Sequence, residues 1–133
     1  MTIGVVNSYN LVFADAAWVR ASNVVDDIYY QDNNQTKDVY YYGDTTQGHR
    51  VYKSGIATGL TYGDVVNEYI NMGTLQDQFT ATYSSATGDS GAPVFIEGST
   101  VRLVGVHGGR WGDYAYFSPI SGVIQDLGIT PLY

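Results

Sequence analysis

The stretch "GDSGAPVFIEGSTVRLVGVHGG", residues 88–109, decides the fold, because it places a glycine-flanked serine ahead of two apolar runs. The runs on either side of "EGST" predict a β-hairpin. The glycines permit backbone conformations in which the amides of Gly88 and Ser90 converge on one point outside the turn. Asp89, tucked inside, would hold the turn through a buried ion pair or amide hydrogen bonds. Ser90 is therefore a candidate nucleophile, and the two amides are a candidate oxyanion hole.

Most of the remaining chain also predicts β-strands. Runs that alternate apolar and polar residues, or that are rich in β-branched and aromatic residues, are typical of half-buried antiparallel strands. The most polar stretch, residues 31–38, predicts a surface loop. The predicted strands cover residues 3–13, 16–22, 39–44, 49–55, 65–73, 78–85 and 114–120.

Residues 118–128 are the exception and predict a short C-terminal helix. Ser118 is its expected cap, Pro119 suits the first turn and Gly128 ends it. Many short strands with one terminal helix predict an all-β fold, an antiparallel barrel or sandwich in one compact unit. The apolar residues at helical spacing are Ile120, Val123, Ile124 and Leu127.

The composition of the 133 residues excludes several classes of function. The formal net charge is −7 and only 6 residues are Lys or Arg, so we expect no nucleic-acid partner and no anionic membrane surface. No cysteine is present, which excludes disulfides and thiolate metal sites. No signal peptide is visible at the start, yet abundant Tyr, Thr, Ser, Asn and Gly with few lysines suit a secreted protein. We therefore expect an extracellular location, with any targeting segment outside this sequence.

The motif around Ser90 resembles the nucleophile motif Gly-Asp-Ser-Gly-Gly-Pro of the chymotrypsin-like serine proteases, with Ala92 in place of the second glycine. "LVGVHGG" (103–109) is similar to the next strand of that family, and "AYFSPISGVIQDLGI" (115–129) to the last strand and closing helix of its bacterial branch. "VYKSGIATGLTYGDV" (51–65) is similar to a bacterial-type hairpin.

The resemblance implies an antiparallel Greek-key β-barrel of the chymotrypsin type. Residues 37–133 would form the complete second barrel, which bears the nucleophile. Residues 1–36 would be a remnant of the first barrel and the connection between the barrels.

"VFADAAWVR" (12–20) resembles the stretch that carries the triad aspartate, which implies that Asp15 is the orienting acid. The alternative is a loop aspartate before a strand. The family's base lies in a segment like Thr-Ala-[AG]-His, and no such segment is present. The two histidines, His49 and His107, both follow Asp15; we expect His49 to lie far from Ser90, and His107 is the alternative as a substitute base. We therefore expect negligible turnover by the isolated chain, and a partner, either an N-terminal fragment that supplies the histidine or further copies of the chain.

The resemblance also implies a substrate pocket. Ser84 would occupy its base, and a neutral base argues against substrates with Lys or Arg. His107 falls where glutamate-specific relatives read the substrate carboxylate, although a half-buried histidine bonded to a backbone carbonyl is the alternative. The register of residues 107–110 stays open by one position, because the family usually has a serine before the glycine pair. The implied substrate-binding residues are Ser84, Ser85, Thr87, His107, Gly108, Gly109 and Arg110.

The sequence predicts no cofactor and no metal site. Residues 26, 27 and 32–34 are acidic or amide residues that suit either a calcium ion or a solvated loop. The function predicted first is a serine endopeptidase, or a fragment of one, and the implied pocket favours acidic residues in the substrate. A non-catalytic module that binds peptide or serves assembly is the second hypothesis, and a structural β-domain whose turn imitates the motif is the third.

Overall fold

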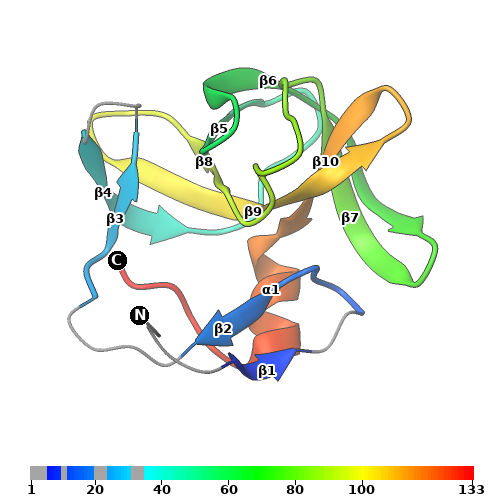
Figure 1. Cartoon of the computed structure of the whole chain (residues 1–133), viewed down its shortest axis with the longest axis horizontal. Helices are drawn as coiled ribbons and strands as arrows, with labels where there is room; N and C mark the ends of the chain where they lie inside the picture. The colour runs from blue at the N-terminus through cyan, green and yellow to red at the C-terminus, as the bar shows by residue number, and fades with distance from the viewer. Residues whose placement is uncertain (1–5, 10–11, 20–23, 31–34) are drawn as a thin grey trace.

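Six antiparallel strands close into a barrel, which forms the upper part of the molecule in Figure 1. The computed structural model describes residues 6–9, 12–19, 24–30 and 35–133. The barrel strands are β5 (Arg50–Gly55), β6 (Gly59–Met72), β7 (Leu75–Ala81), β8 (Pro93–Ile96), β9 (Val101–Trp111) and β10 (Tyr114–Pro119). Around the barrel they follow the order β10, β7, β6, β5, β8, β9, and the pairing of β9 with β10 closes the ring. The predicted hairpin around "EGST" is confirmed as β8 and β9.

Two more strands, β3 (Asp27–Tyr29) and β4 (Thr36–Tyr42), extend the sheet from the side of β9. β4 runs parallel to the start of β9, and β3 pairs antiparallel with β4 as the outer strand. Phe95 and Val101 are fully buried here in a second apolar cluster, which includes Val39 from β4. Asp27 and Asp38 lie directly opposite each other across the β3–β4 pair.

The predicted loop over residues 31–38 is wrong at its end, because β4 already begins at Thr36. Lys37 explains the difference. Its Nζ donates to Glu97 Oε1 at 2.6 Å and to the Gly98 carbonyl at 2.6 Å, and it lies 3.7 Å from the centre of the Tyr30 ring. These tertiary contacts keep a polar stretch in the sheet. Residues 31–34 lie outside the described part of the chain.

The C-terminal helix α1 (Ile120–Leu127) lies beside a small two-stranded sheet of β1 (Val6–Tyr9) and β2 (Ala17–Val19), below the barrel in Figure 1. The helix ends as predicted at Gly128, which has a φ of 66° and donates its amide to Ile124. The predicted start is wrong, because Pro119 occupies the N-cap position and Ser118 makes no cap. The buried Ser118 hydroxyl instead donates to Gln78 Oε1 at 2.9 Å.

These elements confirm the predicted all-β barrel with a short terminal helix. The division of the chain at residue 36 stays a prediction. Apolar side chains from all six barrel strands fill the interior, and the buried residues of this core are Val51, Val65, Phe79, Ala81, Tyr83, Val94, Val104, Ala115 and Phe117.

Gly105 lies where β9 packs tightly against β10. A Cβ built on Gly105 would lie 2.5 Å from Phe117 Cδ2 and closer still to the Ser118 carbonyl oxygen. We expect Gly105→Ala to lower the free energy of unfolding by about 1–3 kcal/mol, because the extra methyl overpacks a closed barrel. Urea denaturation measures this change. Gly43→Ala is the control, since its Cβ would first meet the flexible end of Arg102 at 3.3 Å. Equal stability of Gly105→Ala and the wild type would contradict this packing.

Candidate active site

The buried carboxylate of Asp89 holds the serine turn in place. One oxygen, Oδ1, accepts the amides of Ala57 at 2.9 Å and Thr58 at 3.2 Å. The other, Oδ2, accepts the Thr58 hydroxyl at 2.6 Å and the Ala86 amide at 3.0 Å. It also forms an ion pair with Lys53 Nζ at 3.1 Å, in which both side chains are fully buried. The predicted inward position of Asp89 is thus confirmed, with an ion pair and amide hydrogen bonds together.

Burial alone would raise the pKa of Asp89. The hydrogen bonds from Thr58, Ala86 and Lys53 outweigh burial and hold the pKa well below its usual range. The carboxylate is therefore ionised at neutral pH. Lys53 was not singled out from the sequence, although a signal was present, since the alternation of β5 places Lys53 on the same inward face as Val51.

Ser90 lies exposed at the tip of this turn, and its Oγ donates to the Gly108 carbonyl at 3.0 Å. The backbone conformation on either side of Ser90 explains why the motif contains glycines. Gly88 has a φ of 105° and Gly91 a φ of 87°, in the left-handed region that favours glycine. The turn therefore needs the glycines that the sequence provides.

The amides of the turn divide into two groups. Those of Asp89, Gly91 and Ala92 donate to backbone carbonyls at 2.9–3.0 Å. The amides of Gly88 and Ser90 have no acceptor among the residues that the structure describes. They remain available to an oxygen of a bound molecule, as an oxyanion hole requires.

A pocket of about 300 Å³ opens beside Ser90. It contains five of the predicted substrate-binding residues. Ser84 and Gly108 do not line it: Ser84 is exposed and its carbonyl accepts the Thr61 hydroxyl, while the Gly108 carbonyl accepts Ser90. The lining residues are Ser85, Ala86, Thr87, Ser90, His107, Gly109 and Arg110.

His107 is 2% exposed and its Nδ1 lies 2.7 Å from the Tyr83 hydroxyl. Burial, and then the positive charge of Lys53, lower the pKa of His107 to about 4. The imidazole is therefore neutral at pH 7. The side-chain partner of His107 is the buried Tyr83 hydroxyl, whereas the alternative hypothesis from the sequence is a hydrogen bond to a backbone carbonyl. Because Nδ1 is engaged, a hydrogen bond to a molecule in the pocket would come from Nε2.

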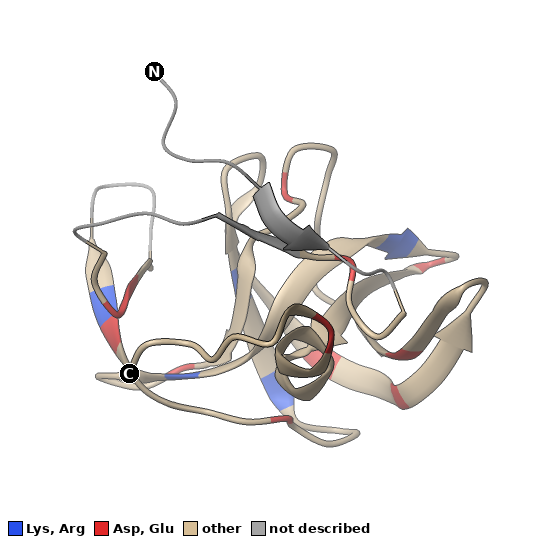
Figure 2. Cartoon of the chain, turned by 90° about the horizontal axis from the view of Figure 1, so that it is seen from below, with Lys and Arg blue, Asp and Glu red and all other residues tan. Residues whose placement is uncertain are grey.

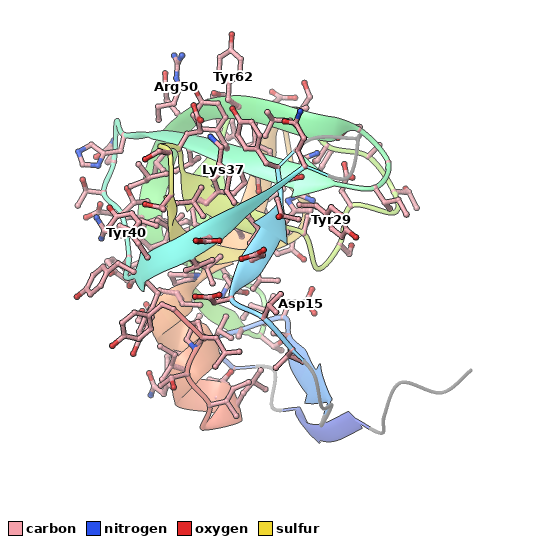
Figure 3. All side chains as sticks on the ribbon, turned by 90° about the vertical axis from the view of Figure 1, so that its left-hand side faces the viewer. Asp15, Tyr29, Lys37, Tyr40, Arg50 and Tyr62 are labelled. Carbon is pink, nitrogen blue, oxygen red and sulfur yellow. The ribbon has the colours of Figure 1, made fainter. Side chains whose placement is uncertain are left out.

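Asp15 lies on the helix side of the barrel, apart from Arg50 and Tyr62 (Figure 3). Its carboxylate accepts the Tyr116 hydroxyl at 3.3 Å. The Tyr116 ring packs on the backbone of residues 108 and 109, where a Cβ on either glycine would meet it. Tyr116 thus connects Asp15 to the same backbone segment that accepts the Ser90 hydroxyl.

The side chains of the two histidines bond residues other than Ser90 and Asp15. His49 precedes β5 and its Nδ1 lies 3.2 Å from the Thr45 hydroxyl. His107 binds Tyr83. Neither histidine forms a hydrogen bond with Ser90 or Asp15, the two candidate catalytic residues, in the described structure.

The described part of the chain contains no group of three His, Cys, Asp or Glu residues suited to a metal ion. Of the candidate calcium ligands, residues 32–34 lie outside the described residues. Figure 2 shows the described Lys and Arg positions dispersed over the barrel rather than gathered in a stripe. No described helix has the length and apolar character needed to cross a bilayer.

Comparison with known proteins identifies the class of fold. No protein-family model and no curated protein matches the chain. Among solved structures, a glutamic acid-specific serine protease that uses a histidine triad in substrate binding superposes with a TM-score of 0.84 and 24% identity, covering 98% of this chain and 74% of that chain. Cellulomonas bogoriensis chymotrypsin superposes with a TM-score of 0.82 and 21% identity, covering 97% of this chain and 75% of that chain. Thermobifida fusca protease A superposes with a TM-score of 0.78 and 26% identity, covering 92% of this chain and 70% of that chain.

The chain therefore has the fold of the bacterial chymotrypsin-like serine proteases. This confirms the resemblance drawn from the residues around Ser90. It also confirms the chymotrypsin type of the barrel.

The Asp89–Lys53 pair predicts how stability depends on pH. The pKa of Asp89 in the folded state lies below its unfolded value of about 3.9, so this group stabilises the fold above about pH 4 and that stability is lost as the pH falls further. Lys53→Met leaves a buried carboxylate unpaired, and we expect a loss of about 3–5 kcal/mol at pH 7 in chemical denaturation.

Lys37→Met is the matched control. Its partner Glu97 is partly exposed, and we expect at most about 1 kcal/mol. Equal losses in the two variants would contradict the dominant role of the Asp89 pair.

Proposed function

We propose that this chain provides the nucleophile, the oxyanion hole and the substrate pocket of a serine endopeptidase. One observation carries the proposal: an exposed Ser90, on a turn fixed by a buried carboxylate, stands beside a pocket and two amides that have no acceptor among the described residues. Acyl transfer needs these groups at one point.

The proposed reaction begins when Ser90 Oγ leaves the Gly108 carbonyl and attacks the carbonyl carbon of the scissile peptide. A base takes the hydroxyl proton as the Oγ–C bond forms, and the amides of Gly88 and Ser90 hold the oxyanion. The C–N bond then breaks, and the base returns the proton to the leaving amine. Water hydrolyses the acyl-enzyme by the same steps. Asp15 would orient the base and stabilise its protonated form.

We propose that the base comes from a partner, because both histidines of this chain are engaged elsewhere. A second pocket, of about 370 Å³, suits such a partner. It begins at Gly91, the residue after the nucleophile, and is walled by Ile28, Leu103 and Val106. Beside its β3 wall, Val25 is 72% exposed. Exposed apolar surface of this kind is typical of an interface. An N-terminal fragment that bears a histidine, or another copy of the chain, would cover it.

We propose a preference for acidic side chains in the pocket beside Ser90. Its lining contains His107, Arg110 and the hydroxyls of Ser85 and Thr87, and no carboxylate. A substrate carboxylate next to His107 would favour the protonated imidazole and a charge-assisted hydrogen bond. Ser85 Oγ is buried without a partner in the described structure, so a ligand could satisfy it. The low count of lysines and the abundance of Tyr, Thr, Ser, Asn and Gly agree with an extracellular protease, which we propose as its location.

A non-catalytic peptide-binding module is the second candidate. The observation that favours it is the hydrogen bond from Ser90 to Gly108, together with the engagement of both histidines. Such a module would use the same pocket and the backbone of residues 108 and 109 to bind an extended peptide.

Fluorophosphonate labelling tests the nucleophile. We expect the isolated chain to react negligibly, since loss of one triad member lowers turnover by about 10⁴–10⁶-fold. Addition of an N-terminal barrel fragment that contains Thr-Ala-Ala-His should restore labelling, and Ser90→Ala should abolish it. Ser99→Ala, on the exposed β8–β9 turn, is the control.

Two results would count against the proposal. Hydrolysis by the isolated chain that disappears in Ser90→Ala would refute the need for an external base. No labelling under either condition would favour the binding module.

Peptide binding to the isolated chain tests the preference independently of turnover. We expect a peptide that ends in glutamate to bind about tenfold more tightly than its glutamine counterpart, because a charged acceptor strengthens the hydrogen bond to His107. Binding should tighten as the pH falls from about 8 to about 5, since His107 takes up a proton with the ligand. Calorimetry on His107→Ala should show the preference lost, and His49→Ala should retain it. A preference that survives in His107→Ala would exclude this role.

A further inference from the structure

Asp126, near the end of α1, binds three successive backbone amides of a segment far away in the sequence. Its Oδ2 accepts the amides of Val12 at 3.1 Å, Phe13 at 2.7 Å and Ala14 at 3.0 Å. A single carboxylate oxygen thus gathers the amides of the three residues that immediately precede Asp15. Hydrogen bonds to an ionised acceptor are stronger than those between neutral groups.

The helix itself does not explain a carboxylate at this position. The last turn of α1 contains no basic residue, and the C-terminal end of a helix carries partial negative charge. Asp126 therefore lies where a carboxylate weakens an isolated helix. The amides of residues 12–14 compensate for this unfavourable position, which points to a role in holding that segment.

Other groups on the barrel and helix bind the same segment. Gln78 Nε2 donates to the Phe13 carbonyl at 2.9 Å, and Ser118 Oγ accepts the Asp15 amide at 2.9 Å. A Cβ on Gly122 would lie 2.5 Å from the Phe13 carbonyl oxygen, so helix and segment touch at the backbone. All four amides of residues 12–15 therefore donate to side chains of the helix or of β10.

We propose that Asp126 is a positioning residue for Asp15: by binding the three preceding amides, it lets the C-terminal helix fix the place of the orienting acid. The role of Asp15 rests on the proposed function, whereas the anchoring of residues 12–15 does not. The acid would then be in position before any base arrives. Asp126 itself would touch neither substrate nor reacting atoms.

Hydrogen exchange on the full chain tests the anchoring. In Asp126→Asn we expect exchange at residues 12–14 to accelerate about tenfold or more, since hydrogen bonds to the carboxylate are lost. Gln125→Ala, at an exposed position on the same helix, should leave exchange unchanged. Asp126→Glu keeps the charge and should retain part of the protection. Unchanged exchange in Asp126→Asn would overturn the anchoring.

The titration of Tyr116 tests the placement of Asp15 without any need for activity. Burial, and then the charge of Asp15, raise the pKa of Tyr116. Asp126→Asn should therefore lower the Tyr116 pKa by as much as Asp15→Asn does, and the double variant should show no further change in NMR titration. A Tyr116 pKa unaffected by Asp126→Asn would overturn the positioning role.

An activity measurement separates this inference from the proposed function. In the chain reconstituted with the base-bearing fragment, Asp126→Asn should lower kcat about as far as Asp15→Asn, with little change in KM. Full kcat in Asp126→Asn would overturn the positioning role. Failure of the wild-type chain to hydrolyse peptide would overturn the proposed function alone, because exchange and titration decide the anchoring.

Discussion

The ionised carboxylate of Asp89, buried in the barrel wall, is the constraint on which the site depends. A charge removed from water needs neutralising partners, and here they come from three places in the chain: β5, the β5–β6 turn and the residue at position 86. The hydrogen bonds that these partners donate to Asp89 attach the serine turn to the barrel. The same geometry leaves Gly55 no room for a side chain, because a Cβ there would meet Asp89. The exposed hydroxyl of Ser90 is therefore presented by a turn that the barrel holds in place.

The two candidate catalytic residues, Asp15 and Ser90, lie far apart in the sequence, and only the fold connects them. Ser90 is bonded to the backbone of β9, on which the Tyr116 ring rests, and Tyr116 is bonded to Asp15. β10 and α1 thus position Asp15 relative to the serine turn. A site arranged in this way depends on the last twenty residues as much as on the motif itself.

Local patterns were sufficient for most of the barrel and for the serine turn, because alternation, glycines and an apolar hairpin act over a few residues. Local patterns gave wrong predictions where contacts with residues distant in the sequence determine the conformation. Ser118 looks like a helix cap, yet it bonds Gln78, which is 40 residues away. Lys37 looks like a loop residue, yet the β8–β9 turn holds it in a strand. The roles of Tyr83 and Asp126 were not predictable for the same reason, since their partners lie 24 and more than 100 residues away.

The closed barrel leaves β3 as the outer strand of the described eight-stranded sheet, and its backbone edge resists strand addition although the apolar surface beside it stays open. β3 has only three residues, and Asp27 and Asp38 face each other across its pairing with β4. A short, acidic edge is a poor template for an added strand from another molecule. The hydrogen bond and charge of Asp27 raise the pKa of Asp38, so this pair takes up a proton more readily than an isolated carboxylate. Acid would therefore weaken the charge repulsion at this edge, and strand addition at β3 would become easier as the pH falls.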